Sequence, residues 1–218
     1  MKENQKELTK EYIEYLLRKL DVELVERGQK SIIYVIGGAN IAMSVDACRT
    51  TTDIDVVVKR GFDIVFEAAK AVAETEEGLA DDWLNAQFTE NTPEGGIAWQ
   101  WFDNKDDDIV TTVYKGRGLI VELASPEMVL ALKTIALRPQ DIPDIYQLMR
   151  MTDIRTPEGI GRNLVRFTGR RIFDAQGITE MFIRIDPTFA EIFDNAPEDL
   201  RLPQRETLRA RFARWMPR

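Results

Sequence analysis

The sequence contains no histidine and only one cysteine, Cys48. Without histidine the chain cannot build a Ser-His-Asp or Cys-His catalytic centre, nor a metal site with histidine ligands. A single cysteine excludes an intrachain disulfide and a zinc cage made of cysteines. Any general base must therefore be a carboxylate, a lysine, a tyrosine or the substrate itself. Catalysis by a metal ion and by positioning stays open, because it needs no histidine.

Long apolar runs are also missing from the 218 residues. No stretch reaches the roughly eighteen apolar residues that indicate a transmembrane helix, so we expect no membrane partner. The N-terminal segment is charged and amphipathic and lacks the apolar region of a signal peptide, which predicts a cytoplasmic location. A content of 44% hydrophobic and 30% charged residues is typical of an ordinary globular protein.

The net charge of −8 argues against strong non-specific binding of nucleic acid, but the charge is unevenly distributed. Residues 150–218 contain 13 arginines and no lysine against 10 acidic residues. One arginine cluster comprises Arg162, Arg166, Arg170 and Arg171, and a second lies within residues 201–218. These clusters are either a surface for RNA or nucleotide phosphate, or solvated helix faces that pair with the acidic N-terminal part.

Two glycines and two aspartates stand about one strand and one helix apart. An apolar stretch, residues 32–36, is expected to be a strand that ends at Gly37 and Gly38, and a short helix is expected over residues 39–45. A second strand is expected over residues 54–58, preceded by Asp53 and containing Asp55. Residues i and i+2 of a strand point to the same face, so the two carboxylates are expected to lie side by side.

This arrangement predicts a metal-dependent phosphate site. Two adjacent carboxylates repel each other and lose hydration, so they call for a cation or for an Arg/Lys cluster. Mg²⁺ prefers such oxygen ligands, keeps several waters and takes its remaining ligands from substrate phosphates. Gly37 and Gly38 at a strand-to-helix turn let backbone amides approach a phosphate, and the helix N-terminus favours an anion. Together these features indicate phosphoryl or nucleotidyl transfer.

The pattern of Gly-Gly, a helix and Asp-apolar-Asp resembles the nucleotidyltransferase superfamily of the DNA polymerase β type. Residues 49–55 (RTTTDID), 82–85 (DWLN) and 125–148 resemble the minimal and abortive-infection-type bacterial nucleotidyltransferases. The resemblance covers roughly residues 30–150. The chain departs from the superfamily in having Gly-Gly where Gly-Ser is common, and Asn40 where a small apolar residue is usual.

The resemblance implies an α/β fold, with a small mixed sheet of the nucleotidyltransferase type flanked by helices. Because the composition shifts after Arg150, we expect this domain to cover residues 1–150, followed by a helical C-terminal appendage over residues 151–218. The implied reaction is Mg²⁺-dependent transfer of a nucleotide from an NTP to a hydroxyl group of RNA (such as tRNA), of a protein or of a small molecule. Some members of the group are toxins of toxin–antitoxin pairs, so a partner protein or a phage-defence setting is also implied.

The implied site residues follow from their positions. Asp53 and Asp55 would bind Mg²⁺. Glu122 would be a third carboxylate, because it stands on a later expected strand, residues 119–123; alternatively, it is a solvent-facing strand residue. The phosphate ligands would be two glycines and two cations, namely Gly37, Gly38, Arg49 and Lys133.

Other interpretations remain open at this point. The chain could have the fold without the chemistry, as an antitoxin or a nucleotide sensor. It could also be an interaction module in which Asp53 and Asp55 pair with Arg49 and Arg60. Two interpretations also stay open for Arg138, Asp141 and Asp144, which follow Lys133. They contribute to the nucleotide-binding cleft, or they form only salt bridges.

Local patterns also predict structure in three segments, within residues 81–88, 97–108 and 204–215. Residues 81–88 are expected to form a short helix in which Trp83 is a core anchor. Residues 97–102 are expected to form a strand, and the acidic loop 103–108 lacks the glycine and closing glutamate of an EF-hand. A last arginine-rich helix is expected over residues 204–215.

Overall fold

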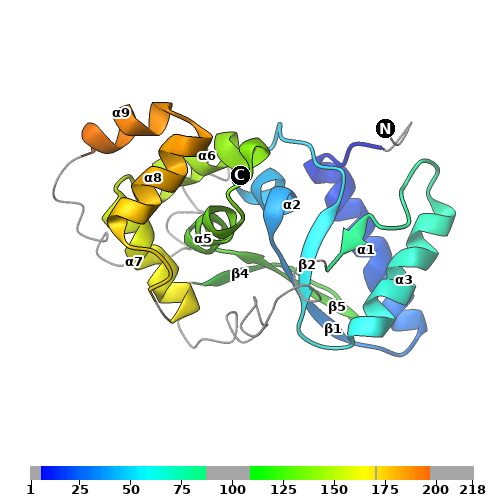
Figure 1. Ribbon diagram of the computed structural model, residues 1–218. Coiled ribbons are helices and arrows are strands. Elements are labelled where there is room, and N and C mark those ends of the chain that lie inside the picture. The colour runs from blue at the N-terminus through cyan, green and yellow to red at the C-terminus, as the bar shows by residue number, and fades with distance from the viewer. Residues whose placement is uncertain (1–5, 87–108, 170, 197–218) are drawn as a thin grey trace, which may run out of the picture. The chain divides into compact units, whose positions relative to one another are not determined.

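The computed structural model describes residues 6–86, 109–169 and 171–196 (Figure 1). The chain divides into two compact units, a first that ends at Ala124 and a second that begins at Ser125. The boundary expected at residue 150 falls inside helix α6 (Ile142–Thr152). The expected strand at 97–102, the acidic loop 103–108 and the expected helix at 204–215 lie outside the described residues. Within those residues, no helix is both long and apolar enough to cross a bilayer.

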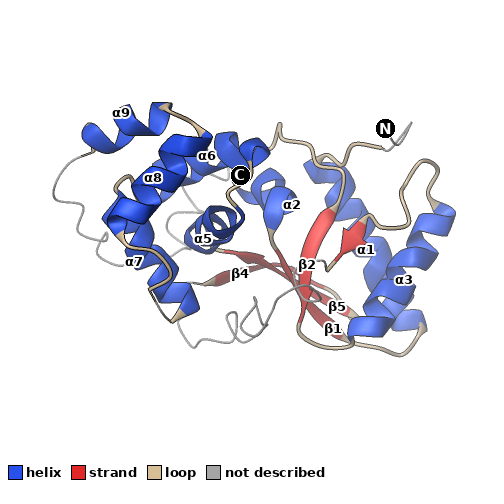
Figure 2. Ribbon diagram, in the orientation of Figure 1, coloured by secondary structure: helices blue, strands red, loops and turns tan. Residues whose placement is uncertain are grey.

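The first unit contains a five-stranded mixed sheet with the strand order β3-β2-β1-β5-β4 (Figure 2). Central strand β1 (Ser31–Val35) pairs antiparallel with β2 (Ile54–Val58) and parallel with β5 (Leu119–Ala124). At the edges, β3 (Leu84–Asn85) runs parallel to β2, and β4 (Val110–Lys115) forms a hairpin with β5. The expectation of a mixed sheet flanked by helices is confirmed.

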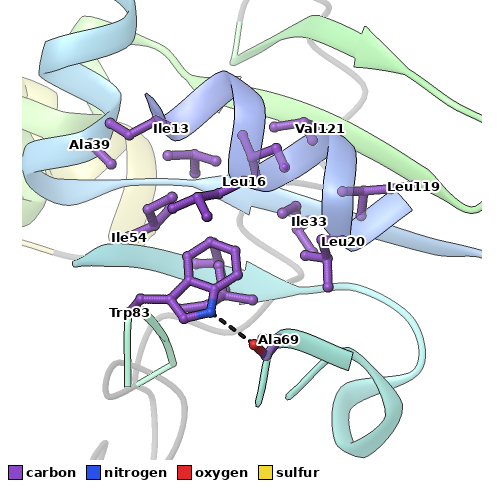
Figure 3. Packing of buried hydrophobic residues seen from close by; sticks show 14 of the residues in the cluster. Ile13, Leu16, Leu20, Ile33, Ala39, Ile54, Ala69, Trp83, Leu119 and Val121 are labelled. Atoms are coloured by element: carbon purple, nitrogen blue, oxygen red, sulfur yellow. Dashed lines mark hydrogen bonds between the residues drawn. The ribbon is translucent and has the colours of Figure 1, made fainter. Parts of the chain in front are cut away.

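The described part of the same unit contains the helices α1 (Lys10–Glu26), α2 (Gly37–Ser44) and α3 (Phe62–Thr75). The buried face of α1 repeats at helical spacing through Ile13, Leu16 and Leu20. These side chains pack against alternate residues of the sheet, such as Ile33 and Val121, which are fully buried (Figure 3). Because strand residues alternate between faces, the opposite face of the sheet is left for Asp55 and its neighbours.

Trp83 anchors the edge of this core. Its side chain is fully buried, and its indole Nε1 donates a hydrogen bond to the Ala69 carbonyl of α3 at 2.9 Å (Figure 3). The Ile54 amide donates to the Trp83 carbonyl at 2.6 Å and so begins the pairing of β2 with β3. Trp83 is thus the predicted core anchor. Residues 81–86, the described part of the helix predicted over 81–88, are not helical, because Leu84 and Asn85 pair with β2 as β3.

A buried carboxylate joins α1 to the β4–β5 hairpin. Asp21 is 8% exposed, and its Oδ1 accepts hydrogen bonds from the backbone amides of Gly118 and Leu119, each at 2.7 Å. The Tyr114 hydroxyl donates to Oδ2 at 3.0 Å. Burial raises the pKa of Tyr114, and the hydrogen bond to Asp21 raises it further.

We expect Asp21→Ala to lower the free energy of unfolding by about 3 kcal/mol, because two buried amide donors lose their acceptor. The pKa of Tyr114 should fall at the same time, since the Asp21 carboxylate no longer disfavours the tyrosinate. Chemical denaturation and ultraviolet titration of tyrosine measure the two effects. Glu14→Ala, on a half-exposed position of the same helix, should change neither. An unchanged Tyr114 pKa in Asp21→Ala would contradict this account.

The described part of the second unit is helical. It contains α5 (Pro126–Ala136), the 3-10 turn η2 (Pro139–Asp141), α6, α7 (Pro157–Thr168), α8 (Ala175–Ile185) and α9 (Thr188–Asp194). Ser125 and Thr156 cap α5 and α7, and a proline follows each cap. The core where α8 meets α9 contains Phe182 and Phe189, whose rings meet edge to face at 4.8 Å.

Candidate functional site

Asp53 and Asp55 lie at the beginning of β2, and both are half-buried. Ile54 between them is fully buried in the core that faces α1 and α3. Asn85 of β3 stands directly opposite Asp55 in the strand pairing, and its amide Nδ2 donates to Asp53 Oδ2 at 3.0 Å. Paired residues share a face of a sheet, so both carboxylates lie on the face away from α1 and α3. We call these two residues the acid pair.

In the Gly-Gly turn, Gly37 lies directly against Asp55 of the acid pair and Gly38 lies against Thr51. A Cβ atom placed on Gly37 would lie 2.5 Å from Asp55 Oδ2, and one on Gly38 would lie 3.0 Å from the Thr51 hydroxyl. The Ile36 amide donates to the Asp55 carbonyl at 2.9 Å, which fixes the turn to β2. Any side chain at Gly37 would therefore occupy the space next to the Asp55 carboxylate.

The same turn begins α2. Ile36 is the N-cap residue and supplies no side-chain hydrogen bond, and Gly37 has a φ of 64°. The first amides of a helix have no partner within the helix, and the helix dipole adds partial positive charge there. The N-terminus of α2 therefore attracts anions at a place where Asp55 already supplies a negative charge. A phosphate can join the carboxylates there only if a cation lies between them.

Asn40, which stands where a small apolar residue is usual in the superfamily that the sequence resembles, holds α2 in place. It is 1% exposed, and its Nδ2 donates to the carbonyls of Val35 at 2.9 Å and of Ala124 at 3.0 Å. Its Oδ1 accepts a hydrogen bond from Ser44 at 3.1 Å. A buried amide with its donors and acceptor paired fixes the helix to the ends of β1 and β5. The departure thus serves the position of the Gly-Gly turn.

Sequence reasoning assigned no role to two residues that contact the acid pair, Thr51 and Asn85. The Thr51 hydroxyl donates to the Asp53 carbonyl at 3.1 Å, and its backbone pairs with Leu8, which is fully buried. Asn85 is oriented by the β3 pairing that Trp83 anchors. The stretch DWLN contributes only to the resemblance in the sequence. The helix predicted there does not place Asn85 beside Asp53.

Glu122 does not join the acid pair. It stands opposite Tyr34 of β1, which in turn stands opposite Val57 of β2, so β1 separates it from Asp55. Two strand spacings put it about 10 Å to the side. Its Oε1 accepts a hydrogen bond from Thr112 of β4 at 3.2 Å. In the described part of the chain, no three Asp, Glu or Cys side chains gather closely enough to hold a metal ion.

Lys133 lies in the second unit, within a buried ion-pair network on α5, η2 and α6. Its Nζ is 2.7 Å from Asp141 Oδ1 and 2.8 Å from Asp144 Oδ2, and all three side chains are nearly inaccessible to solvent. Arg138 Nε donates to the other oxygen of Asp141 at 2.9 Å. Burial raises the pKa of Asp141, but the bonds from Lys133 and Arg138 outweigh it and leave the pKa below its ordinary value of 3.8. The salt-bridge interpretation of Arg138, Asp141 and Asp144 agrees with this geometry, and phosphate binding by Lys133 stays a prediction.

Arg49 and Arg60, the two arginines that the sequence analysis relates to this site, differ in their position relative to the acid pair. Arg49 is half-buried, two residues before Thr51, and its role as a phosphate ligand stays a prediction. Arg60 is exposed and follows the far end of β2. The Arg60 carbonyl accepts a hydrogen bond from Ser31 at the beginning of β1, whereas the Asp55 carbonyl accepts one from Ile36 just past its end, so at about 3.3 Å per residue the length of β1 keeps Arg60 beyond the reach of Asp55. Arg60 is therefore no counterion for the acid pair.

We expect Gly37→Ala to perturb the site more than its backbone conformation alone requires. A left-handed alanine costs about 1–2 kcal/mol, and the new Cβ must also push Asp55 aside. Gly78→Ala is the matched control, since Gly78 also has a positive φ of 76° but nothing within 4 Å of its added Cβ. Thermal melts and Mg²⁺ binding should therefore separate the variants, with metal binding lost only in Gly37→Ala. Equal behaviour of both variants would show that the space beside Asp55 is not used.

The donors at this site fit Mg²⁺. Two carboxylates on one face supply the oxygen ligands that Mg²⁺ takes from a protein, and its usual remaining ligands are waters and substrate phosphates. The N-terminus of α2, whose N-cap residue makes no side-chain hydrogen bond, lies beside Asp55 and supplies amide donors for such a phosphate. Comparison of the chain with family models, with curated proteins and with solved structures found no match.

Proposed function

We propose that this protein is a nucleotidyltransferase that uses Mg²⁺ to transfer a nucleotide from an NTP to a hydroxyl group. The observation that carries the proposal is the contact of the Gly-Gly turn with Asp55, where a Cβ on Gly37 would lie 2.5 Å from the carboxylate oxygen. A phosphate bound at the N-terminus of α2 and a carboxylate this close to it repel each other unless a cation lies between them. An NTP with its metal ion would supply the phosphate for the helix N-terminus and the cation for the carboxylate.

Each residue of the site has a separate task in this proposal. Asp53 and Asp55 would hold the metal ion, and Asp53 is oriented for it by Asn85, which donates to Oδ2 at 3.0 Å, and by Thr51, whose hydroxyl lies 3.5 Å from Oδ1. The amides of Gly37 and Gly38 bind the β- and γ-phosphates at the N-terminus of α2. A bound Mg²⁺ would neutralise the triphosphate and the leaving pyrophosphate and lower the pKa of the attacking hydroxyl. Catalysis then rests on positioning and electrostatics, which suits a chain without histidine.

The transfer needs no reactant other than the NTP and the hydroxyl acceptor. The acceptor oxygen forms a bond to the α-phosphorus, and the bond from that phosphorus to the oxygen that bridges to the β-phosphate breaks. Pyrophosphate leaves with the electron pair of that bond, and the hydroxyl proton passes to water. Asp53 and Asp55 would position the metal ion and the Gly-Gly turn the phosphates, so that the reacting groups lie in line.

Labelled nucleotides test the reaction type. We expect the protein with Mg²⁺ to move label from an α-labelled NTP onto RNA, protein or a small hydroxylated compound from a cell extract, and to release pyrophosphate. A γ-labelled NTP should leave no label on the acceptor. Transfer of the γ-label would make the protein a phosphotransferase instead. Tight binding of NTP and Mg²⁺ without transfer would favour the nucleotide sensor.

We expect Asn85→Ala to weaken Mg²⁺ binding about tenfold, because Asp53 loses the hydrogen bond that orients it. Asn85→Asp should not restore binding, since a third carboxylate would repel Asp53 instead of donating to it. Titration of Mg²⁺ in the presence of an NTP measures both variants. Trp83→Phe is a further variant for comparison. It removes the indole hydrogen bond that anchors β3 and leaves the Asn85 amide in place. Full Mg²⁺ affinity in Asn85→Ala would remove Asn85 from the site.

A further inference from the structure

The second unit contains a groove of about 680 Å³ between α7 and the segment that leads into α8. A stripe of α7 forms one wall, including Gly161, Arg162 and Val165. The residues that run up to and into α8 form the other, including Arg171, Phe173 and Ala175. A Cβ on Gly161 would meet Ile178 of α8 at 3.3 Å, so the two helices pack closely there. Small residues on both walls leave the groove unfilled.

The groove has one arginine on each wall. Arg162 and Arg171 are both exposed, and neither forms an ion pair with any residue that the structure describes. Two acidic residues also line the groove, Glu158 and Asp174. Asp174 is engaged in capping α8, since its Oδ1 accepts from the Gly177 amide at 2.8 Å. Two guanidinium groups are thus available to an anion that enters the groove.

We propose that this groove binds a phosphorylated nucleoside, either as a free mononucleotide or as one nucleotide of an RNA strand. Guanidinium groups bind phosphate through paired, charge-assisted hydrogen bonds. The half-buried Phe173 and the exposed Val165 supply an apolar surface for a base, and aromatic side chains stack on bases of any sequence. Glu158 supplies an acceptor for ribose hydroxyls. The volume lies within the range of about 300–1,000 Å³ for small-ligand sites.

This site differs from the acid pair in its chemistry. It uses arginines in place of carboxylates and a metal ion, so its binding should persist in EDTA. The experiment is equilibrium binding of each of the four nucleoside monophosphates to the full chain in EDTA, with adenosine and inorganic phosphate as partial ligands. We expect a monophosphate to bind at least about tenfold more tightly than either partial ligand, because only it engages both the arginines and the apolar wall.

Paired variants locate the site. Arg162→Gln with Arg171→Gln should weaken binding at least about tenfold, since two charge-assisted contacts are lost. Arg166→Gln with Arg184→Gln removes the same charge from exposed positions of α7 and α8 outside the groove, and it should change binding little. All four residues are exposed, so thermal melts should show intact folding. A short oligoribonucleotide distinguishes the two sources, because it binds more tightly than the monophosphate only if RNA is the ligand.

Three results would overturn this inference. One is the absence of binding by any monophosphate. Another is binding that survives the loss of Arg162 and Arg171. The last is an equal loss in the control pair, which would reduce the effect to net charge. None of these results bears on the acid pair, because EDTA removes its metal ion from the assay.

Discussion

Asp53→Asn and Asp55→Asn are each expected to reduce nucleotidyl transfer at least about a thousandfold. An amide keeps the shape of the side chain but removes the charge that holds the metal ion. A metal ion supplies several kcal/mol of charge stabilisation in the transition state, and about 4 kcal/mol corresponds to three orders of magnitude in rate. Both variants should fold normally, because each removes one of two mutually repelling charges. Their melting temperatures should equal or exceed that of the wild type.

Asp81→Asn is the matched control for this prediction. Asp81 is an exposed aspartate of the same unit, two residues before Trp83 and outside the strand pairing. Removing its charge should leave transfer and melting unchanged. An Asp53→Asn protein with full activity would sink the proposed role of the acid pair, whereas a variant that loses both activity and fold would leave Asp55→Asn as the deciding test.

Lys133→Met is expected to destabilise the second unit by about 3–5 kcal/mol, the cost of leaving buried carboxylates without their cation. Lys133 contacts Asp141 and Asp144 at once, and both are nearly inaccessible to solvent. Arg138 would still contact Asp141, but its own side chain is more than half exposed and compensates little. Hydrogen exchange of the α5 and α6 amides measures the loss within this unit.

The pH dependence identifies the cause. In the wild type the pKa of Asp141 lies below 3.8, so its contribution to stability is present above that pH and is lost as the pH falls through the folded pKa. Without Lys133, burial should raise the pKa of Asp141 instead. The deficit of Lys133→Met should therefore be largest near neutral pH and shrink toward pH 4. A triple variant that also changes Asp141 and Asp144 to asparagine should recover most of the stability, and a deficit that is the same at every pH would contradict the charge argument.

The sequence predicted the acid pair and the Gly-Gly turn because both depend on local periodicity. Alternation over residues 54–58 was enough to orient Asp55 away from the core, and two glycines after an apolar strand were enough to locate the turn. Their contact depends on the antiparallel pairing of β1 with β2 across a helix. Local periodicity cannot predict that contact, because it joins residues of two different strands.

The features that local sequence patterns do not predict lie where distant residues decide local structure. Residues 81–86 do not form the predicted helix. The Trp83 indole donates a hydrogen bond to the Ala69 carbonyl, and the Trp83 carbonyl accepts one from the Ile54 amide, so the residues that follow pair with β2 as β3. Asn85 was overlooked for the same reason. The position of Glu122 depends on which side of β1 the last hairpin joins, and no local pattern encodes that choice. Likewise, the partners of Lys133 come from beyond the helix-breaking Pro139.

The most direct test of the metal–nucleotide site is a thermal melt of the wild type and of the Asp53→Asn/Asp55→Asn double variant. Each protein is melted with each of the four NTPs, with and without Mg²⁺. We expect a rise in melting temperature that requires both an NTP and Mg²⁺ and that is absent in the double variant, because only the native state binds the pair. An unchanged melting temperature with every NTP, or the same rise in the double variant, would contradict the account.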